Sequence, residues 1–454
     1  MLDGSDALLV AIEMGYGHLR AAYALGGELG LPVANADQAP LADEVERKLW
    51  ARARRSYEFV SRASQLPVMG GPFDFALGAL TAIPGLYPMR DLSAPTWAVR
   101  YLARSAKRGL GRGLVEHLGA SGRALLTTFY APAVLADMAG CERVFCVVTD
   151  TDVNRVWVPP DVRRSRIQYL VPGHRTARRL QSYGVAKEHI LTTGFPLPPE
   201  LLGGRDLAVL KRNLAARLLR LDPAGTFREV YGDEVDHFLA VPRPTGSAAA
   251  PLVTFAVGGA GAQADLPAAF LRGFRGPLEA GRLRLALVAG VRPEVAARFE
   301  KTIARNGLGH LVGERLQIVE APDLGSYFSV FNALLAETDV LWTKPSELTF
   351  FGALGLPLLL TAPVGRHEAY NLRWAREAGV GLKQRNPAYV GERLLDWLDD
   401  GTLAGAAWSG FMRMPKFGTY KIADAVRRGT ATTPPPPRPE RRQISLGGVI
   451  ATDL

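Results

Sequence analysis

Short apolar runs alternate with helical patterns along the first part of the chain. The run ALLVAI at residues 7–12 leads into a glycine turn and a helical pattern, and later runs lie at residues 123–129, 143–150, 167–172 and 189–196. Buried strands that alternate with helices are typical of a parallel sheet covered on both faces. The pattern predicts a doubly wound α/β domain over residues 1–202.

The same alternation begins again in the second part of the chain. Apolar runs lie at residues 251–257, 283–290, 316–322, 339–344 and 357–363. We predict a second Rossmann-like domain at residues 251–430, after an irregular linker at 203–250. A chain of 454 residues agrees with two cores, because it is about two to three times as long as a typical domain. Residues 431–454 form a basic, proline-rich tail, which we predict to be disordered or extended.

One segment departs from this alternation, at about residues 50–118. Its apolar middle is interrupted by prolines and glycines, whereas a bilayer span needs about 20 uninterrupted apolar residues. A helix near its end sorts aromatic and basic side chains to two faces, which suits the surface of an anionic membrane. A helical insertion packed on its own domain is the alternative. The side chains concerned are Trp97, Arg100, Tyr101, Leu102, Arg104, Lys107 and Arg108.

Composition and charge narrow the classes of function. Hydrophobic residues make up 48% of the chain and charged ones 22%, which excludes wholesale disorder. The net charge of +10 favours anionic partners such as nucleotide diphosphates, acidic lipids or nucleic acid. The excess of basic residues is mainly arginine, so a high GC content of the genome is the alternative explanation. Nucleic-acid binding is disfavoured, because the basic residues are scattered and form no recognised motif.

The cysteines and the start of the chain bear on its location. Cys141 and Cys146 cannot form a disulfide framework or a four-ligand zinc site, which favours a reducing compartment. The chain passes from MLDGSD directly into a strand pattern, without the pattern of a secretory leader. We predict a cytoplasmic protein, peripheral at the inner face of the membrane if the segment at 50–118 binds lipid.

A glycine turn follows the first predicted strand. The sequence GYGH at residues 15–18 opens a helix there, and the free N–H groups of Gly15 and Gly17 suit a phosphate or a closely packed substrate. Arg20 stands where a dinucleotide-binding motif has its third glycine, which disfavours an NAD enzyme. His18 is a candidate general base, because imidazole titrates near neutral pH. A capping or packing histidine is the alternative.

Three loops of the second half end predicted strands in the same way. VGGAGAQ at residues 257–263 repeats the glycine turn, and TKPSE and APVGRHEAYN follow two later strands. Ligands of open α/β sheets bind at such strand ends, so these loops predict one pocket. A capped helix on a solvated edge is the alternative for TKPSE. The candidates for lining the pocket are Lys344, Ser346, Glu347, His367, Glu368 and Asn371.

These motifs carry a family resemblance. In their order along residues 7–428, GYGHLRAA, VVTDTDVNRVWVPP and DVLWTKPSELTFFGALGLPLLL with GRHEAYN resemble GT-B glycosyltransferases. The branch is the one that holds monogalactosyldiacylglycerol synthase and the peptidoglycan-lipid N-acetylglucosaminyltransferase. The resemblance implies the GT-B fold, two Rossmann-like domains facing a central cleft. It also implies a nucleotide sugar, usually UDP-linked, bound by the second domain and an acceptor, commonly a lipid, bound by the first.

The resemblance implies a role for each matching residue. His18 is the glycine-loop base or substrate contact, and Asp150 lies at the strand end that faces the acceptor. On the donor side the matching residues are Gly258, Gly259, Gly261, Lys344, Pro345, Glu368 and Asn371. We predict sugar transfer with inversion, in which His18 or Asp150 takes the acceptor proton while Lys344, Arg366 or backbone N–H groups stabilise the diphosphate. No metal or cofactor is required, and DTD at 150–152 is weak evidence for magnesium.

One departure from the family pattern bears on specificity. A glutamate that binds the ribose hydroxyls is expected where this chain has Gly352. The stretch from Lys344 to Pro357 is also about two residues shorter than in the family pattern. Glu347 is the candidate replacement. The departure leaves room for a different nucleotide, or for a non-catalytic relative that binds nucleotide sugar or lipid. A nucleotide-sugar epimerase or hydrolase of the same fold, which needs no acceptor, is a further alternative.

Overall fold

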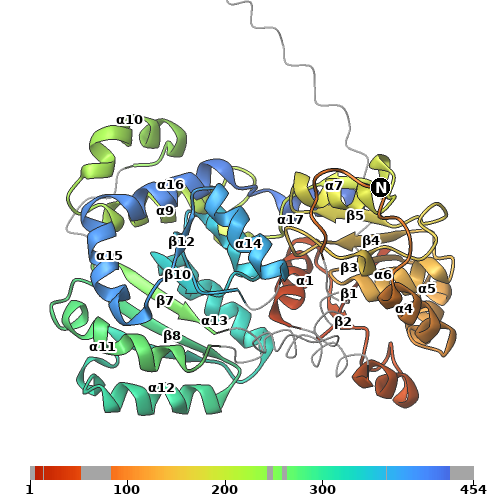
Figure 1. Cartoon of the computed structure of the whole chain (residues 1–454), viewed down its shortest axis with the longest axis horizontal. Helices are drawn as coiled ribbons and strands as arrows, with labels where there is room; N and C mark the ends of the chain where they lie inside the picture. The colour runs from red at the N-terminus through yellow and green to blue at the C-terminus, as the bar shows by residue number, and fades with distance from the viewer. Residues whose placement is uncertain are drawn as a thin grey trace, which may run out of the picture.

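The computed structural model describes residues 6–13, 15–52, 83–242, 249–257, 263–363 and 366–429. These residues form two six-stranded sheets, with strand orders β2-β1-β3-β4-β5-β6 and β12-β11-β10-β7-β8-β9. Every strand pairing is parallel, and helices cover the sheets (Figure 1). The predicted α/β class with two doubly wound Rossmann-like domains is therefore confirmed.

The first domain is built around β1, from which the chain runs outward in both directions. Its strands are β1 (Ala7–Ala11), β2 (Val33–Asn35), β3 (Ala124–Thr127), β4 (Val144–Val147), β5 (Gln168–Val171) and β6 (Ile190–Thr192). Its helices are α1 (Tyr16–Leu29), α4 (Trp97–Lys107), α5 (Arg112–Ser121), α6 (Tyr130–Met138) and α7 (His174–Ser182). Because the strand order reverses between β1 and β3, the loops after these two strands lie where ligands of such sheets bind.

The second domain is also built outward from its first strand, β7, with two strands on one side of it and three on the other. Its strands are β7 (Leu252–Ala256), β8 (Arg284–Gly290), β9 (Leu316–Glu320), β10 (Val340–Thr343), β11 (Leu358–Leu360) and β12 (Gly381–Lys383). Its helices are α11 (Leu266–Glu279), α12 (Pro293–Arg305), α13 (Leu324–Glu337), the 3₁₀ helix η5 (Glu347–Leu354), α14 (Arg366–Glu377), α15 (Val390–Asp399) and α16 (Thr402–Arg413). The order reverses between β7 and β10, so TKPSE follows a strand at this second switch point.

The region at 203–250, predicted as an irregular linker, contains two helices. They are α9 (Ala208–Leu221) and α10 (Thr226–Leu239), and the short α8 (Pro199–Leu202) precedes them. Leucines four residues apart on α9, such as Leu210 and Leu214, are buried against the second domain, which explains why this polar stretch folds as a helix. The prediction of an irregular segment is therefore wrong for these residues.

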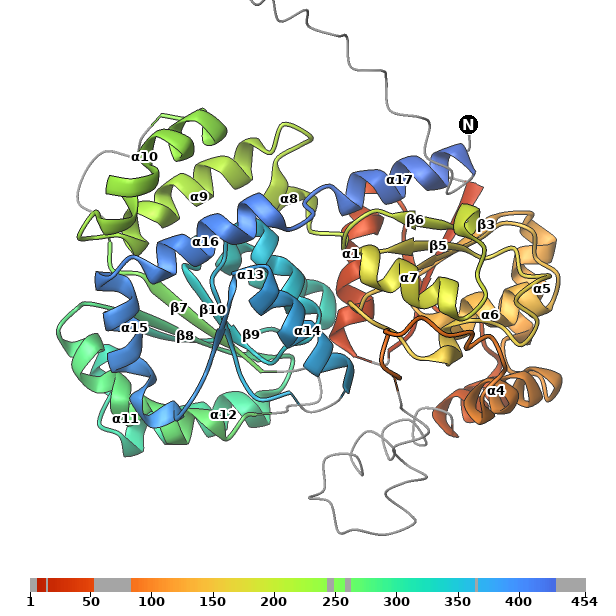
Figure 2. The same cartoon turned by 45° about the horizontal axis from the view of Figure 1, so that its top comes forward.

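The end of the described chain returns to the first domain. Helix α17 (Gly418–Arg428) follows α16 and packs against α1, as Figure 2 shows. Phe195 and Phe350 stack with ring centroids 4.7 Å apart, and one buried apolar cluster runs from Leu9 of the first sheet to Trp342 of the second. Apolar packing therefore fixes how the two domains face each other.

Two predicted segments fall partly or wholly outside the described residues. Of the predicted insertion at about 50–118, residues 53–82 are not described, and the described part includes α4 and the start of α5. The whole of the predicted tail at 431–454 lies beyond the last described residue, 429. Among the described helices, none combines the length and the apolar content that a membrane span requires.

Candidate functional site

His18 lies in the first turn of α1, at the boundary between the two domains. Its Nδ1 is 2.9 Å from the carbonyl oxygen of Thr128 and 3.0 Å from Oγ1 of Thr149. A carbonyl oxygen only accepts hydrogen bonds, so Nδ1 carries the proton and donates it. The lone pair of the neutral ring is then on Nε2, to which no described residue hydrogen-bonds. This is the tautomer that a general base at Nε2 needs.

The surroundings of His18 fix its ring and tune its charge. Phe129 packs edge-on against it at 4.6 Å between centroids, and the Thr128 hydroxyl donates to the His18 carbonyl at 2.8 Å. Burial lowers the pKa of His18 below its usual value near 6.5, although Asp150 and Glu347 oppose this shift. The imidazole is therefore neutral at pH 7, with two carboxylates near enough to stabilise an imidazolium.

Asn371 connects the two domains next to this histidine. Its Oδ1 accepts from the amide and the hydroxyl of Thr151, at 3.1 and 2.7 Å, and its Nδ2 donates to Oδ1 of Asp150 at 3.3 Å. The same Nδ2 donates to the Pro345 carbonyl at 3.1 Å. The predicted candidates Asp150, Pro345 and Asn371 are thus brought together, one from the first domain and two from the second.

Lys344 follows β10 at the carboxyl edge of the second sheet. Its Nζ forms an ion pair with Oε1 of Glu368, which is 2% exposed. Lys344 belongs to the loop after β10, and Glu368 to the first turn of α14. A diphosphate bound here would compete with Glu368 for the lysine charge.

The turn between Lys344 and η5 is tighter than an ordinary helix start. The amide of Ser346 donates to the Lys344 carbonyl at 2.8 Å, and the Ser346 hydroxyl makes no capping hydrogen bond to η5. The alternative of a serine-capped α-helix therefore does not describe this loop, which leads into a 3₁₀ helix instead.

Glu347 reaches from η5 to the glycine loop of the first domain. A Cβ at Gly17 would come within 3.1 Å of Oε2 of Glu347, so the Glu347 side chain would have to shift slightly if this residue were not glycine. On its other side the carboxylate faces Arg20, with 3.7 Å between Oε1 and Nε. The predicted Glu347 is therefore in place at the boundary, together with an arginine that was not predicted as a site residue.

Gly352, where the family pattern has a glutamate, lies in the core rather than at this boundary. A Cβ there would come within 2.8 Å of Sδ of Met414 and 3.0 Å of Val380. The carbonyl oxygen of Gly352 would be 2.3 Å from a Cβ at Gly410 of α16. The two glycines allow η5 and α16 to pack together, and a glutamate at position 352 has no room.

The structure describes some of the remaining predicted residues. His367 lies close enough to His18 to lower its pKa, and Gly15 precedes α1 with φ of +136°, which favours glycine. Arg366 begins α14, and the loop with Gly258, Gly259 and Gly261 lies outside the described residues. Thr128 and Thr149 were not predicted from the sequence. Thr128 directly follows β3 at the switch point, and a polar residue in that position is a usable signal.

The DTD sequence at 150–152 does not gather metal ligands. Oδ1 of Asp152 accepts from Nε of Arg179 at 2.7 Å, and Oδ2 accepts from Nε of Arg175 at 2.9 Å. Asp152 and Arg179 are both fully buried, so this carboxylate serves a buried ion pair. In the part of the chain that the structure describes, no cluster of three or more His, Cys, Asp or Glu side chains has the geometry of a metal site.

Solved structures of glycosyltransferases and of an epimerase are distantly similar to this chain, whereas no protein-family model and no curated protein matches it. MurG from Acinetobacter baumannii aligns with a TM-score of 0.48 and 11% identity, over 93% of this chain and 99% of that chain. CalG4, the calicheamicin glycosyltransferase, has a TM-score of 0.48 and 15% identity, over 93% and 98%. The UDP-GlcNAc 2-epimerase from Neisseria meningitidis bound to UDP-GlcNAc has a TM-score of 0.46 and 10% identity, over 93% and 99%.

Proposed function

We propose that the chain transfers a sugar from a nucleotide-diphosphate donor, a UDP-sugar, to an acceptor hydroxyl. The observation that carries the proposal is the position of His18 at the domain boundary. Its Nδ1 is occupied by the Thr128 carbonyl, its pKa is lowered by burial, and carboxylates of both domains lie near it. A histidine in that state can remove a proton from a hydroxyl at neutral pH.

The proposed reaction is a single displacement. Nε2 of His18 takes the acceptor proton, the acceptor oxygen forms a bond to the anomeric carbon, and the bond from that carbon to the diphosphate breaks. The configuration at this carbon is inverted, because the acceptor attacks opposite the leaving group. Lys344, released from Glu368, and Arg366 then balance the charge of the departing diphosphate.

The carboxylates of the second domain have a separate role in this proposal. Glu347 and Glu368 accept hydrogen bonds from hydroxyls of the ribose or of the transferred sugar, and Asn371 holds the loop around Asp150 against the donor loop. Such contacts orient the donor without taking part in bond making. The proposal assigns the donor to the second domain and the acceptor to the first.

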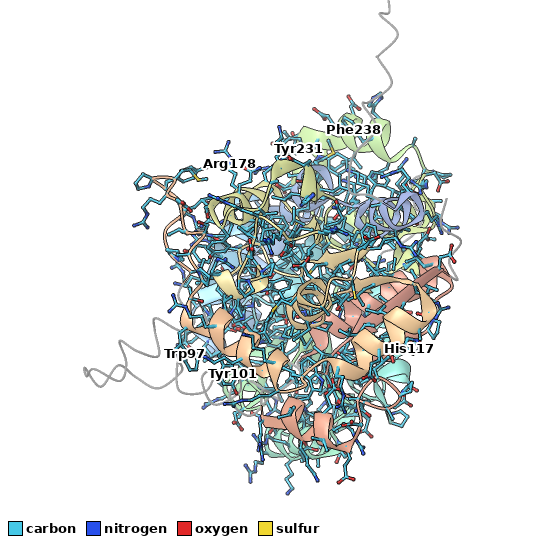
Figure 3. All side chains as sticks on the ribbon, turned by 90° about the vertical axis from the view of Figure 1, so that its right-hand side faces the viewer. Trp97, Tyr101, His117, Arg178, Tyr231 and Phe238 are labelled. Carbon is cyan, nitrogen blue, oxygen red and sulfur yellow. The ribbon has the colours of Figure 1, made fainter. Side chains whose placement is uncertain are left out.

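A lipid is the proposed class of acceptor, bound at an anionic membrane surface. Trp97 and Tyr101 of α4 are 57% and 39% exposed, and their rings stack 5.3 Å apart on the surface of the first domain (Figure 3). Arg104 and Lys107 lie in the last turn of the same helix. Exposed aromatic rings beside basic side chains suit the headgroup region of an anionic bilayer.

The experiment that tests the proposal measures nucleoside diphosphate released from UDP-sugars, with and without a lipid extract or a panel of soluble acceptors. We expect release that requires lipid and a radiolabelled sugar that moves into the lipid fraction. Equal release without any acceptor would instead identify a hydrolase, and interconversion of the donor without release would identify an epimerase. Donor binding without turnover under every condition would identify a non-catalytic relative.

A further inference from the structure

Arg20 reaches from the first domain into the second. It lies on α1, two residues after His18, and is 2% exposed. Its Cζ is 4.6 Å from the ring centroid of Phe331 and 4.9 Å from that of Phe328. The rings of Tyr327 and Phe351 complete a cage at 5.5 and 5.6 Å, and all four residues belong to α13 or η5 of the second domain. Figures 1 and 2 show α1 facing this domain.

The guanidinium has fewer hydrogen bonds than its burial demands. Nη2 donates to the Tyr327 hydroxyl at 3.3 Å, whereas Nε and Nη1 have no hydrogen-bond partner among the described residues. A buried charge is costly unless it is paired, and the aromatic faces offset only part of that cost. The carboxylate of Glu347 supplies the opposite charge, at 3.7 Å from Nε.

The Glu347 side chain lies against this arginine. Its side chain is 12% exposed and lies between the glycine loop at Gly17 and the guanidinium. No described residue donates a hydrogen bond to its carboxylate, so the arginine charge is its counter-ion. One oxygen faces Arg20 and the other lies at Gly17, next to His18.

We propose that Arg20 is a positioning residue that holds the Glu347 carboxylate toward the hydroxyls of the donor. The inference rests on the proposed function and assigns a specificity role to a residue of the opposite domain. Because the cage comes from the second domain and Arg20 from the first, the carboxylate is held only when the two domains are in contact. Donor recognition is thereby coupled to domain closure.

Lysine cannot fully replace arginine in this role. A guanidinium is planar, stacks on aromatic rings and presents several N–H groups at fixed angles, whereas an ammonium is a compact and strongly hydrated point charge. Arg20→Lys therefore retains the charge opposite Glu347 but loses the fit to the rings. Arg20→Met retains apolar contact with the rings and loses the charge.

Steady-state kinetics with a UDP-sugar test the inference. We expect Arg20→Met to raise the donor KM about tenfold, with kcat within about threefold of the wild type, which is the size expected for one charged contact. Arg20→Lys should raise KM about threefold. In a Glu347→Gln background the same substitutions should change KM less than about twofold, because the carboxylate on which Arg20 acts is gone.

A matched control separates positioning from mere domain contact. Tyr23 lies on the same face of α1 and packs on Phe328 with centroids 4.9 Å apart. Tyr23→Ala removes an interdomain contact without touching Glu347, and we expect its KM to stay within about twofold of the wild type. If Arg20→Met does not fold, Arg20→Lys and Glu347→Gln, measured singly and together, provide the same double-mutant cycle.

Each outcome decides the inference. Equal KM increases in both backgrounds, or an unchanged KM in Arg20→Met, would overturn it and leave Arg20 as a structural contact while the proposed function stands. If the wild-type chain used no nucleotide sugar, the proposed function would fail and the inference with it. The wild-type measurement therefore distinguishes the two failures.

Discussion

Replacing His18 by alanine is expected to reduce turnover of the donor by about a thousandfold, a loss typical of removing a general base. The affinity for the nucleotide sugar should change little, because the proposed donor contacts come from the second domain. Turnover is measured as diphosphate release, and affinity by calorimetric titration of the same variant. A fall in kcat without a matching change in Kd is the signature of a group that acts in the chemical step.

The pH dependence provides the control for this substitution. Burial lowers the pKa of His18 below its usual value near 6.5, so the neutral, active form is lost only as the pH falls below 6.5. In the wild type, kcat/KM should therefore fall as the pH decreases below 6.5. The residual activity of His18→Ala should lack this acid limb. His117→Ala on α5, the matched exchange away from the boundary, should have wild-type turnover. Wild-type turnover in His18→Ala would show that His18 is not the general base.

The same pKa shift has a consequence for stability. The folded state binds a proton at His18 less readily than the unfolded state, so this residue favours folding above pH 6.5. That contribution is lost as the pH falls from about 6.5 through the lowered pKa of the folded state. The acid limb of activity and this loss of stability therefore fall in the same pH window, and activity should be measured at temperatures well below unfolding.

Introducing the family glutamate at position 352 is expected to destabilise the fold by more than about 3 kcal/mol. The new side chain would have to displace Met414 and Val380 and would bury a carboxylate without a partner. Urea unfolding followed by circular dichroism measures the change as a lower midpoint. We expect no gain in affinity for UDP, because position 352 does not face the domain boundary.

The control for this variant is a glutamate at a glycine with open surroundings. A Cβ at Gly276 of α11 would have no neighbour within 4 Å, and Gly276→Glu should leave the unfolding midpoint nearly unchanged. A Gly352→Glu variant that is as stable as Gly276→Glu and binds UDP more tightly would show that position 352 does line the donor site.

The strands and their terminal loops could be predicted from the sequence, because buried parallel strands leave continuous apolar runs. The runs around Leu9 and Leu341 predicted the two sheets, and the loops and helix starts that follow such runs contain the candidates His18, Lys344 and Asn371. These predictions depend only on local patterns and on the rule that strand ends share one edge of a sheet. The structure places His18 and Asn371 at the domain boundary, and Lys344 against Glu368 in the second domain.

The contacts across that boundary could not be predicted in the same way. Arg20 is notable in the sequence only for standing in place of a glycine, and its cage on α13 exists because the two domains pack at one particular angle. The sequence alone suggests that Gly352 replaces a lost functional residue. In the structure, Gly352 allows η5 to pack against α16, which lies more than fifty positions later in the chain. Both contacts depend on packing between segments that are far apart in the sequence, so no local pattern predicts them.

A thermal-shift titration of the wild type and of Lys344→Ala tests most directly the central claim, that loops of the second domain bind a nucleotide diphosphate at the domain boundary. Among UDP-, GDP-, TDP- and ADP-sugars, we expect UDP-sugars to raise the wild-type Tm by several degrees and Lys344→Ala to lose most of that shift. Lys421→Ala on the exposed side of α17 should keep it. No shift with any nucleotide, or a full shift in Lys344→Ala, would contradict the account.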